Sequence, residues 1–398
     1  MKKVMMLGGN YFQMTAVQAA RELGYYVIDV DYLPGNPAHA LANAYYNIST
    51  LDKEKVLAKA RELGIDGIVS YASDVSAPTA AYVAEAMGLK TNPYDSVNIM
   101  THKDLFRDFL RENGFACPMG ATFVDFAEAY AFFLRQDKTM VVKPIDASGS
   151  KGVSKVEAKE CFEDAWKEAK KYSRSGKVII EEFIERVGYQ IDGDVFVVDG
   201  KVAFFGICDQ HQDFACNRYA PIAHSFPSVM DAHVLDNAKQ QLERLLGLLG
   251  MHMGAYNLEF IVSRDGQVYF LEVGPRNGGN LITDAIKEAC GVDLAKATVA
   301  QACGDDPLPH LQQTRQGCAS SYIIHTDRDG VFKGIRKDPC IAGRIAKELV
   351  FVKEGDEVHR FVNGAFGVGA SVLRFDNVRQ MNEMIEEMQR YYAVELVE

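Results

Sequence analysis

The first ninety residues alternate between short apolar runs and stretches with helical hydrophobic spacing. Strands are predicted at residues 3–7, 26–30 and 67–71, and helices at 15–23, 53–63 and 78–87. A strand–helix order of this kind predicts a parallel sheet with helices on both faces. Ligands of such sheets bind at the carboxyl ends of the strands, where Gly8, Gly9, Asp31 and Asp74 lie.

Beyond a linker at residues 91–96 the pattern changes to paired strands. Thr101 is a candidate helix N-cap, and Gly114 is a candidate helix end. Asp199-Gly200 and Asp265-Gly266 each separate two apolar runs, which is typical of a two-residue hairpin turn. Helices are expected at 103–112, 161–172, 231–249 and 378–391, and strands at 139–143, 178–180, 195–198, 201–206, 258–262 and 268–273. The region 207–230 is polar and is expected to be irregular.

Composition narrows the class of protein. The chain of 398 residues is 48% hydrophobic and 24% charged, which are ordinary globular values. A net charge of −11 gives no general attraction for nucleic acid, so no nucleic-acid partner is expected. The eight cysteines form no C-x-x-C pair, which argues against a disulfide scaffold and a cysteine zinc site. The apolar run 4–7 is too short for a signal peptide and no run is long enough to span a membrane, so a cytoplasmic protein without a membrane partner is expected.

The second hairpin carries candidate metal ligands. A two-residue turn at Asp265-Gly266 puts Arg264 opposite Gln267 and, in the same register, Glu259 opposite Glu272. Two carboxylates facing each other repel unless they share a proton or bind a cation. Oxygen ligands of this kind favour Mg²⁺ or Mn²⁺. The alternative is a pair of solvent-exposed glutamates, because the other face would hold the apolar residues Leu258, Phe260, Leu271 and Val273.

Three further segments carry candidate ligand contacts. Lys143 ends an apolar strand before a Ser/Gly loop, which offers phosphates a cation and backbone amides, although the P-loop pattern is absent. Arg276 follows Gly274-Pro275 and could clamp a carboxylate or phosphate with two hydrogen bonds. The apolar run 178–180 continues into acids and then Phe183 and Ile184, which could pack on a flat base. Taken singly, each segment could also be an ordinary surface loop or strand end.

Together and in this order, the segments resemble the ATP-grasp superfamily of carboxylate–amine ligases over nearly the whole chain. The resemblance implies an α/β plus α+β fold with three parts: a Rossmann-like pre-ATP-grasp domain (1–96), a two-lobed ATP-grasp domain (97–305, small lobe 97–180 and large lobe 181–305) and a C-terminal completion (306–398). It implies ATP and Mg²⁺ (or Mn²⁺) as cofactors. The expected reaction activates a small-molecule carboxylate as an acyl phosphate for attack by an amine, releasing ADP and phosphate. The sequence does not fix the oligomeric state, and a homodimer is left open.

The same resemblance assigns roles to individual residues. It makes Lys103 and Lys143 the lysines that contact ATP, and it makes Glu259 and Glu272 the Mg²⁺ ligands. It gives Arg276 the stabilisation of the transferring phosphoryl group, the catalytic role. The loop over the phosphates would be Ser148, Gly149, Ser150 and Gly152, the adenine site would be Glu181, Glu182, Phe183 and Ile184, and candidate substrate contacts are His224, Arg218, Asp74 and Gly9.

Two positions depart from the family pattern. The family usually has Asn two residues after the second metal-binding Glu, where this chain has Gly274; Asn257, which would pair across from Gly274, or Asn277 could supply the missing oxygen. The acidic residue that often contacts ribose is absent near Gly188-Tyr189, and Glu185 is a candidate substitute.

Several functions remain as alternatives to an amino-acid or dipeptide ligase. A purine-biosynthesis-type enzyme is less favoured, because the turn 8–13 offers backbone amides but no arginine for a phosphoribosyl group. A biotin-carboxylase-like enzyme is not excluded. An NAD-dependent oxidoreductase is suggested by Gly8-Gly9 with Asp31, but the third glycine of that fingerprint is absent. A non-catalytic nucleotide-binding protein is suggested by Gly274.

Overall fold

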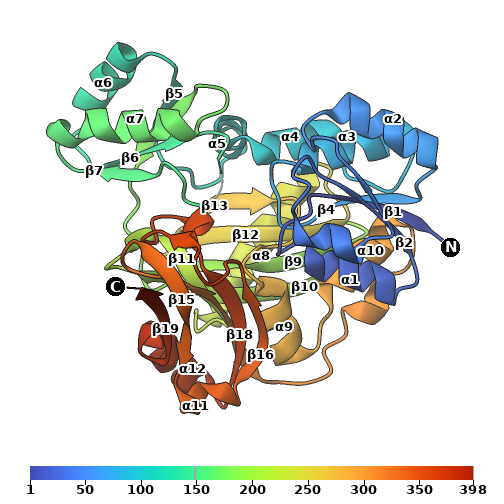
Figure 1. The fold of residues 1–398 in the computed structure, drawn as a ribbon. Helices are drawn as coiled ribbons and strands as arrows, with labels where there is room; N and C mark the ends of the chain where they lie inside the picture. The colour runs from blue at the N-terminus through green and yellow to red at the C-terminus, as the bar shows by residue number, and fades with distance from the viewer. Residues whose placement is uncertain (148, 398) are drawn as a thin grey trace.

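The computed structural model describes residues 1–147 and 149–397, and Figure 1 shows its arrangement. The N-terminal part contains a parallel four-stranded sheet of order β3-β2-β1-β4, as the alternating pattern predicts. Its strands are β1 (Lys3–Leu7), β2 (Tyr26–Val30), β3 (Ala44–Tyr46) and β4 (Gly67–Ser70), and its helices are α1 (Met14–Glu22), α2 (Lys53–Leu63), α3 (Ala77–Met87) and α4 (Tyr94–Thr101). The third strand and α4 were not predicted.

Helices cover both faces of this sheet. Buried residues of α2 and α3 pack with Met5 and Ile28 on one face. On the other face α1 packs together with α10 (Leu294–Ala302), whose Val299 lies in the same apolar cluster as Val4. Local signals set the helix bounds: Asp52 accepts a hydrogen bond from the Lys55 backbone N–H at the start of α2, and Gly64 ends that helix with φ 59°.

The small lobe is a separate four-stranded sheet of order β5-β8-β6-β7, at the upper left in Figure 1. It contains β5 (Gly120–Phe123), β6 (Met140–Pro144), β7 (Ser154–Val156) and β8 (Val178–Glu182), with α5 (Lys103–Glu112), α6 (Phe126–Leu134) and α7 (Phe162–Tyr172) beside it. The bounds of α5 agree with the prediction, but Thr101 is not its N-cap. Thr101 ends α4, and its hydroxyl donates to the carbonyls of Val97 and Asn98.

The largest sheet has eight strands in the order β13-β12-β9-β10-β11-β14-β18-β16. Its strands are β9 (Gln190–Val198), β10 (Lys201–Asp213), β11 (Asn217–Phe226), β12 (Gly254–Val262), β13 (Val268–Gly274), β14 (Cys318–Ile324), β16 (Ile345–Val350) and β18 (Gly369–Phe375), and α8 (Ala232–Leu248) and α9 (Ile282–Cys290) lie against it. The two-residue turn at Asp199-Gly200 is confirmed, since Val198 pairs with Lys201. The region 207–230 is not irregular, because it forms most of a long β-hairpin.

The remaining C-terminal elements form a small sheet of order β17-β15-β19 with short helices beside it. They are β15 (Gly330–Lys337), α11 (Pro339–Ala342), β17 (Glu357–Val358), α12 (Val378–Glu386), α13 (Met388–Tyr391) and β19 (Tyr392–Val397). The predicted helix 378–391 is therefore broken at Glu387. Within the described residues, no helix combines the length and apolar character needed to cross a bilayer.

The mixed α/β plus α+β class agrees with the prediction. The division at residues 96 and 305 stays a prediction, and two features cross it. Helix α10 packs on the N-terminal sheet, and the C-terminal strands β14, β16 and β18 extend the large sheet.

Candidate nucleotide and metal site

A cavity of about 350 Å³ lies between the small lobe and the large sheet. Most of the predicted site residues line it, namely Lys103, Lys143, Gly149, Ser150, Glu181, Glu182, Phe183, Ile184, Arg218, Glu259 and Glu272. These residues come from α5, β6, β8, β11, β12 and β13 and from the loops after β6 and β8, and they approach one another only in the folded chain. Ser148 lies outside the described residues.

The register of the β12–β13 hairpin confirms the predicted pairing of Glu259 with Glu272. The predicted turn is wrong, however, because Ser263 N–H bonds the Gln267 carbonyl and three residues lie between them. A β-bulge restores the register: Glu259 pairs with Glu272 but Phe260 pairs with Phe270, so Leu271 is the extra residue. Leu271 consequently lines the cavity instead of the apolar core that the sequence assigned to it.

The acid pair carries more negative charge than its neighbours neutralise. Burial, followed by the proximity of Asp192 and Glu272, raises the pKa of Glu259 well above its ordinary value. Lys103 Nζ lies 3.2 Å from Glu272 Oε2, and Gln190 Nε2 lies 3.3 Å from Glu259 Oε2. A surplus of partly buried carboxylate oxygens is the donor set that Mg²⁺ prefers, so the residues present fit this cation.

A second charged cluster lies across the cavity, on the small lobe. Both Lys143 Nζ and Arg107 contact the carboxylate of Glu181, and the Arg107 Nε–Glu181 Oε2 distance is 3.1 Å. Burial would raise the pKa of Glu181, but Arg107 and Lys143 together lower it to about 2. Burial lowers the pKa of Lys143, although Glu181 opposes this effect.

Arg107 is a residue that the sequence analysis missed. Its side chain is 1% exposed, and its guanidinium donates to the backbone carbonyls of Phe270 (3.3 Å) and Leu271 (3.0 Å) as well as to Glu181. Arg107 therefore fastens the bulge of β13 to α5 and β8. Its position on the apolar face of α5, beside Phe106 and Leu110, was the signal that could have identified it.

Arg276 forms a bidentate ion pair with Asp74. Its Nε lies 2.7 Å from Asp74 Oδ1 and its Nη2 lies 2.6 Å from Asp74 Oδ2. Burial would raise the pKa of Asp74, but Arg276 holds it below its ordinary value. This pair explains Gly274, because a Cβ at that position would lie 2.7 Å from Asp74 Oδ1 and 3.2 Å from Arg276 Nε.

The two asparagines suggested as a third metal ligand have other partners. Asn257 Nδ2 donates to Asp192 Oδ1 (2.7 Å), and its Oδ1 accepts from Arg276. Asn277 is fully buried, donates to Asp194 (3.1 Å) and accepts from Thr298 (2.8 Å). Neither lines the cavity, which corrects the assignment of Asn277 to the metal site: its amide instead belongs to the network around Asp194. Burial raises the pKa of Asp194 to about 7, although Gly278 N–H and Asn277 donate to it.

Other predicted contacts also lie apart from the cavity. His224 is buried within the large sheet, with Nδ1 3.2 Å from Ser321 Oγ and Nε2 3.2 Å from Asp192 Oδ2. Gly152 packs closely on α7 and Pro144, and Gly9 packs on His39 and Asp29. Glu185, the suggested ribose contact, pairs with Arg264 at 3.0 Å and is not among the residues lining the cavity.

A second cavity of about 310 Å³ adjoins the first, and the two share Lys103, Ala147, Leu271 and Glu272 in their walls. Its lining includes residues of both charges: Asp74 and Glu272 are acidic, and Lys53 and Arg174 are basic. Because Lys103 and Glu272 border both spaces, groups bound in the two cavities would meet at this pair.

Comparisons with known proteins identify a matching family and several relatives. Residues 100–280 match the ATP-grasp domain family. The chain is 26% identical to a formate-dependent phosphoribosylglycinamide formyltransferase of Haemophilus ducreyi, covering 98% of this chain and 95% of that protein. It shares its fold with an L-amino acid ligase from Bacillus licheniformis (TM-score 0.84, 19% identity, 100% and 99% covered) and a phosphoribosylglycinamide synthetase from Anaerococcus prevotii (TM-score 0.78, 19% identity, both chains fully covered).

Proposed function

Because this chain belongs to the ATP-grasp superfamily, whose members use Mg-ATP, we propose that it joins a small carboxylic acid to an amine while ATP is cleaved to ADP and phosphate. The carboxylate attacks the γ-phosphorus and displaces ADP, which gives an acyl phosphate. The amine then attacks the acyl carbon, loses a proton and displaces phosphate. The finer part of the proposal is an amino acid, or a similar zwitterion, as a substrate.

The observation that supports the reaction most strongly is that two lysines and two glutamates line the same cavity. Lys103 and Lys143 would neutralise phosphate oxygens, and Glu259 and Glu272 would hold Mg²⁺. The metal supplies charge neutralisation as the phosphoryl group transfers. Arg276 lies 3.8 Å from Glu272 and is oriented by Asp74, so it would stabilise charge on the transferring group.

Glu182 and Phe183 would form the adenine site together with Ile184 and Lys155. The Phe183 ring lies 4.5 Å from Lys155 Nζ, which stiffens this wall of the cavity. The backbone N–H groups of Glu182 and Phe183 are already bonded to Met119 and Thr139, so in this proposal Phe183 contributes its ring face to adenine.

Mixed charge in the adjoining cavity supports an amino-acid-like substrate. The N-terminal turn gives independent support against a phosphoribosyl group. Gly9 N–H donates to Asp31, Gly8 N–H donates to the Val30 carbonyl and Asn10 N–H donates to Gln13, so these amides are engaged. Buried Asp29 and Asp31 beneath the turn would also repel a phosphate.

A second candidate is a formate-dependent phosphoribosylglycinamide formyltransferase. The near end-to-end match with the Haemophilus ducreyi protein favours it. That reaction also proceeds from a carboxylate and an amine, so the two candidates differ in substrates and share the ATP chemistry. We expect the reaction to occur in the cytoplasm, without a nucleic-acid or membrane partner.

Phosphate release from Mg-ATP tests both candidates. The purified protein is assayed with pairs of amino acids, and separately with formate plus phosphoribosylglycinamide. Release that requires one amino-acid pair, with mass-spectrometric detection of the joined product, supports the proposal. Release only with formate plus phosphoribosylglycinamide selects the second candidate. No substrate-dependent release in either arm, while Mg-ATP still binds, would favour the non-catalytic reading instead.

A further inference from the structure

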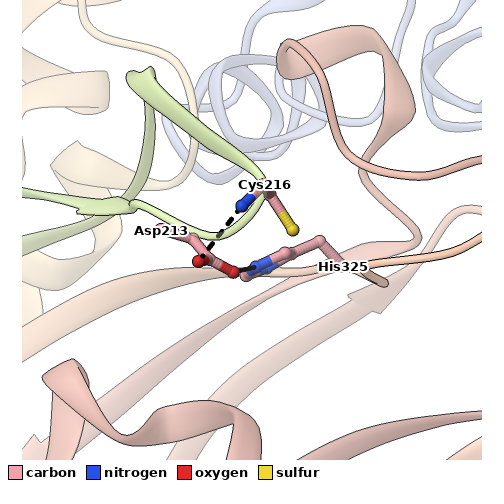
Figure 2. Close-up of side chains that lie close together, drawn as sticks. All are labelled: Asp213, Cys216 and His325. Carbon is pink, nitrogen blue, oxygen red and sulfur yellow. Dashed lines mark hydrogen bonds and ion pairs between the residues drawn. The ribbon is translucent and has the colours of Figure 1, made fainter.

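A cluster of metal-ligating side chains lies outside the nucleotide cavity, where the β10–β11 turn meets the C-terminal segment. Asp213 ends β10, Cys216 lies in the turn, and His325 directly follows β14. One ligand atom from each residue lies within 4.8 Å of the other two. Figure 2 shows the three side chains converging.

Neighbouring backbone groups orient two of these side chains. The His325 Nδ1 lies 2.7 Å from the Ile323 carbonyl and donates its proton there, so Nε2 is the ring nitrogen left to bind a metal ion. The Asp213 Oδ1 accepts from the Ala215 N–H (2.8 Å), which leaves Oδ2 facing His325 Nε2 at 3.1 Å. Two lone pairs that face each other at this distance repel, and a shared proton, a donor such as the Gln389 amide or a metal ion relieves the repulsion.

We propose that Asp213, Cys216 and His325 bind a Zn²⁺ ion. Carboxylate, thiolate and imidazole are all zinc ligands, and an Nδ1–H bonded to a backbone carbonyl is the usual support for a zinc-binding histidine. Tetrahedral zinc bonds give ligand-to-ligand separations of about 3.3–3.7 Å. The Asp213–His325 edge is already close to this range, and the Cys216 side chain needs to move by only about 1 Å. The thiol proton passes to solvent when the metal binds.

The fourth position faces solvent through Gln389. Its Nε2 lies 2.8 Å from His325 Nε2 and contacts Asp213 Oδ2, and its side chain is exposed. Rotating the amide by half a turn directs its oxygen toward the same point, and such an exchange needs no backbone movement. Gln389 or a water molecule therefore completes four-coordination.

The ion would fasten one wall of the nucleotide cavity to the C-terminal part of the chain. The turn that holds Cys216 also carries Phe214, and Arg218 and Tyr219 follow it; all three line the nucleotide cavity. The Tyr219 carbonyl accepts a hydrogen bond from Ser150 Oγ at 2.8 Å, which connects the same turn to the small lobe. The site would thus hold in place the start of β11, which Ser150 contacts.

Metal binding to the whole chain tests the proposal. The protein is stripped with a chelator, incubated with excess Zn²⁺ or Co²⁺ and desalted, and retained metal is measured by mass spectrometry. One equivalent per chain and a thiolate-to-cobalt charge-transfer band are expected. Both should persist in E272Q, which places the ion away from the acid pair. Wild-type protein that retains no metal, or only metal that E272Q loses, overturns the proposal.

Variants assign the ligands. C216S and H325Q are expected to bind Zn²⁺ at least tenfold more weakly and to lose the rise in Tm that Zn²⁺ gives the wild type. C340S is the matched control. Cys340 is exposed and lies outside the cluster, and its backbone N–H bonds an aspartate (Asp338, 2.9 Å). C216S is expected to fold, because the Cys216 side chain is only partly buried, and circular dichroism verifies this. Undiminished metal retention and cobalt absorption in folded C216S would refute the assignment.

Discussion

Two charged clusters lie on opposite sides of the nucleotide cavity, and their charge balance differs. On the small lobe, Glu181 is 4% exposed and faces two cations, Arg107 and Lys143. On the large sheet, Glu259 faces Glu272 and Asp192, with cations farther away. The pKa of Glu181 is lowered to about 2, whereas the pKa of Glu259 is raised. The pKa values of two glutamates that line one cavity are therefore shifted in opposite directions by their neighbours.

In the Glu181 cluster the charges are neutralised within the protein, whereas the Glu259 cluster requires a further cation. Neutralising Glu181 leaves two buried cations without a partner, which is costly. Neutralising Glu259 removes a repulsion, so the folded chain gains stability and loses its affinity for Mg²⁺. Charge substitutions should therefore have opposite effects on stability at the two clusters.

The largest effect is expected for E181Q. Breaking a buried ion pair costs about 3–5 kcal/mol, so the free energy of unfolding at pH 7 should fall by about this amount. Glu181 has a folded pKa near 2 and an ordinary value of 4.5, so its contribution is complete above pH 4.5 and is lost as the pH falls toward 2. Urea unfolding at several pH values measures this. The neighbouring E182Q, which affects an exposed pair with Lys138, should cost at most about 1 kcal/mol. Equal losses for both variants would contradict the assignment.

At the acid pair, E259Q should reduce substrate-dependent ADP formation by about 10²-fold or more, because a bound metal contributes several kcal/mol to phosphoryl transfer. Without Mg²⁺, the same variant should unfold at higher urea, with a gain of about 1 kcal/mol. Assays of ADP formation and of urea unfolding without Mg²⁺ measure the expected loss of activity and the expected gain in stability. A variant that is less stable than the metal-free wild type would show that the acid pair is already neutralised within the protein.

Arg107 connects the two clusters, and R107K should weaken both. Lysine keeps the charge but cannot donate at once to Glu181 and to the carbonyls of Phe270 and Leu271. The expected loss of stability is about 1–3 kcal/mol, and the apparent affinity for Mg²⁺ should fall about tenfold. The Mg²⁺ dependence of activity distinguishes misplaced metal ligands from a general loss of stability. In R107K, the Mg²⁺ concentration needed for half-maximal activity should change more than kcat at saturating Mg²⁺. R111K, on the exposed face of the same helix, is the control. An unchanged Mg²⁺ requirement in R107K would show that the bulge does not depend on this residue.

Much of the fold follows from local patterns. The helix 103–112 and the strand 26–30 have their predicted bounds, because hydrophobic spacing and flanking glycines define them. The strand Ala44–Tyr46 and the full length of β10 were missed, since short or polar strands are stabilised by their neighbours in the sheet. The Asp213–His325 contact spans 112 residues and has no local pattern to reveal it.

The acid pair could be predicted because strand pairing relates distant positions by a simple register. That prediction succeeded through two compensating features: the turn is one residue longer than expected, and the bulge at Leu271 restores the register. Arg107 and the Asp74–Arg276 pair could not be predicted in the same way. Their partners come from different sheets, and only tertiary packing brings them together.

The smallest effect is expected at Gly274, where the family pattern has Asn. A side chain there would meet Asp74 and Arg276, so G274A and G274N should displace this ion pair and cost about 1 kcal/mol of stability. ADP formation should fall several-fold, because Arg276 loses its orientation. G279A is the matched control, since a Cβ at Gly279 meets only Ala72 at 3.9 Å. If G274N instead tightened Mg²⁺ binding at undiminished activity, then the glycine would be a lost metal ligand and the Asp74–Arg276 pair would not be the reason for it.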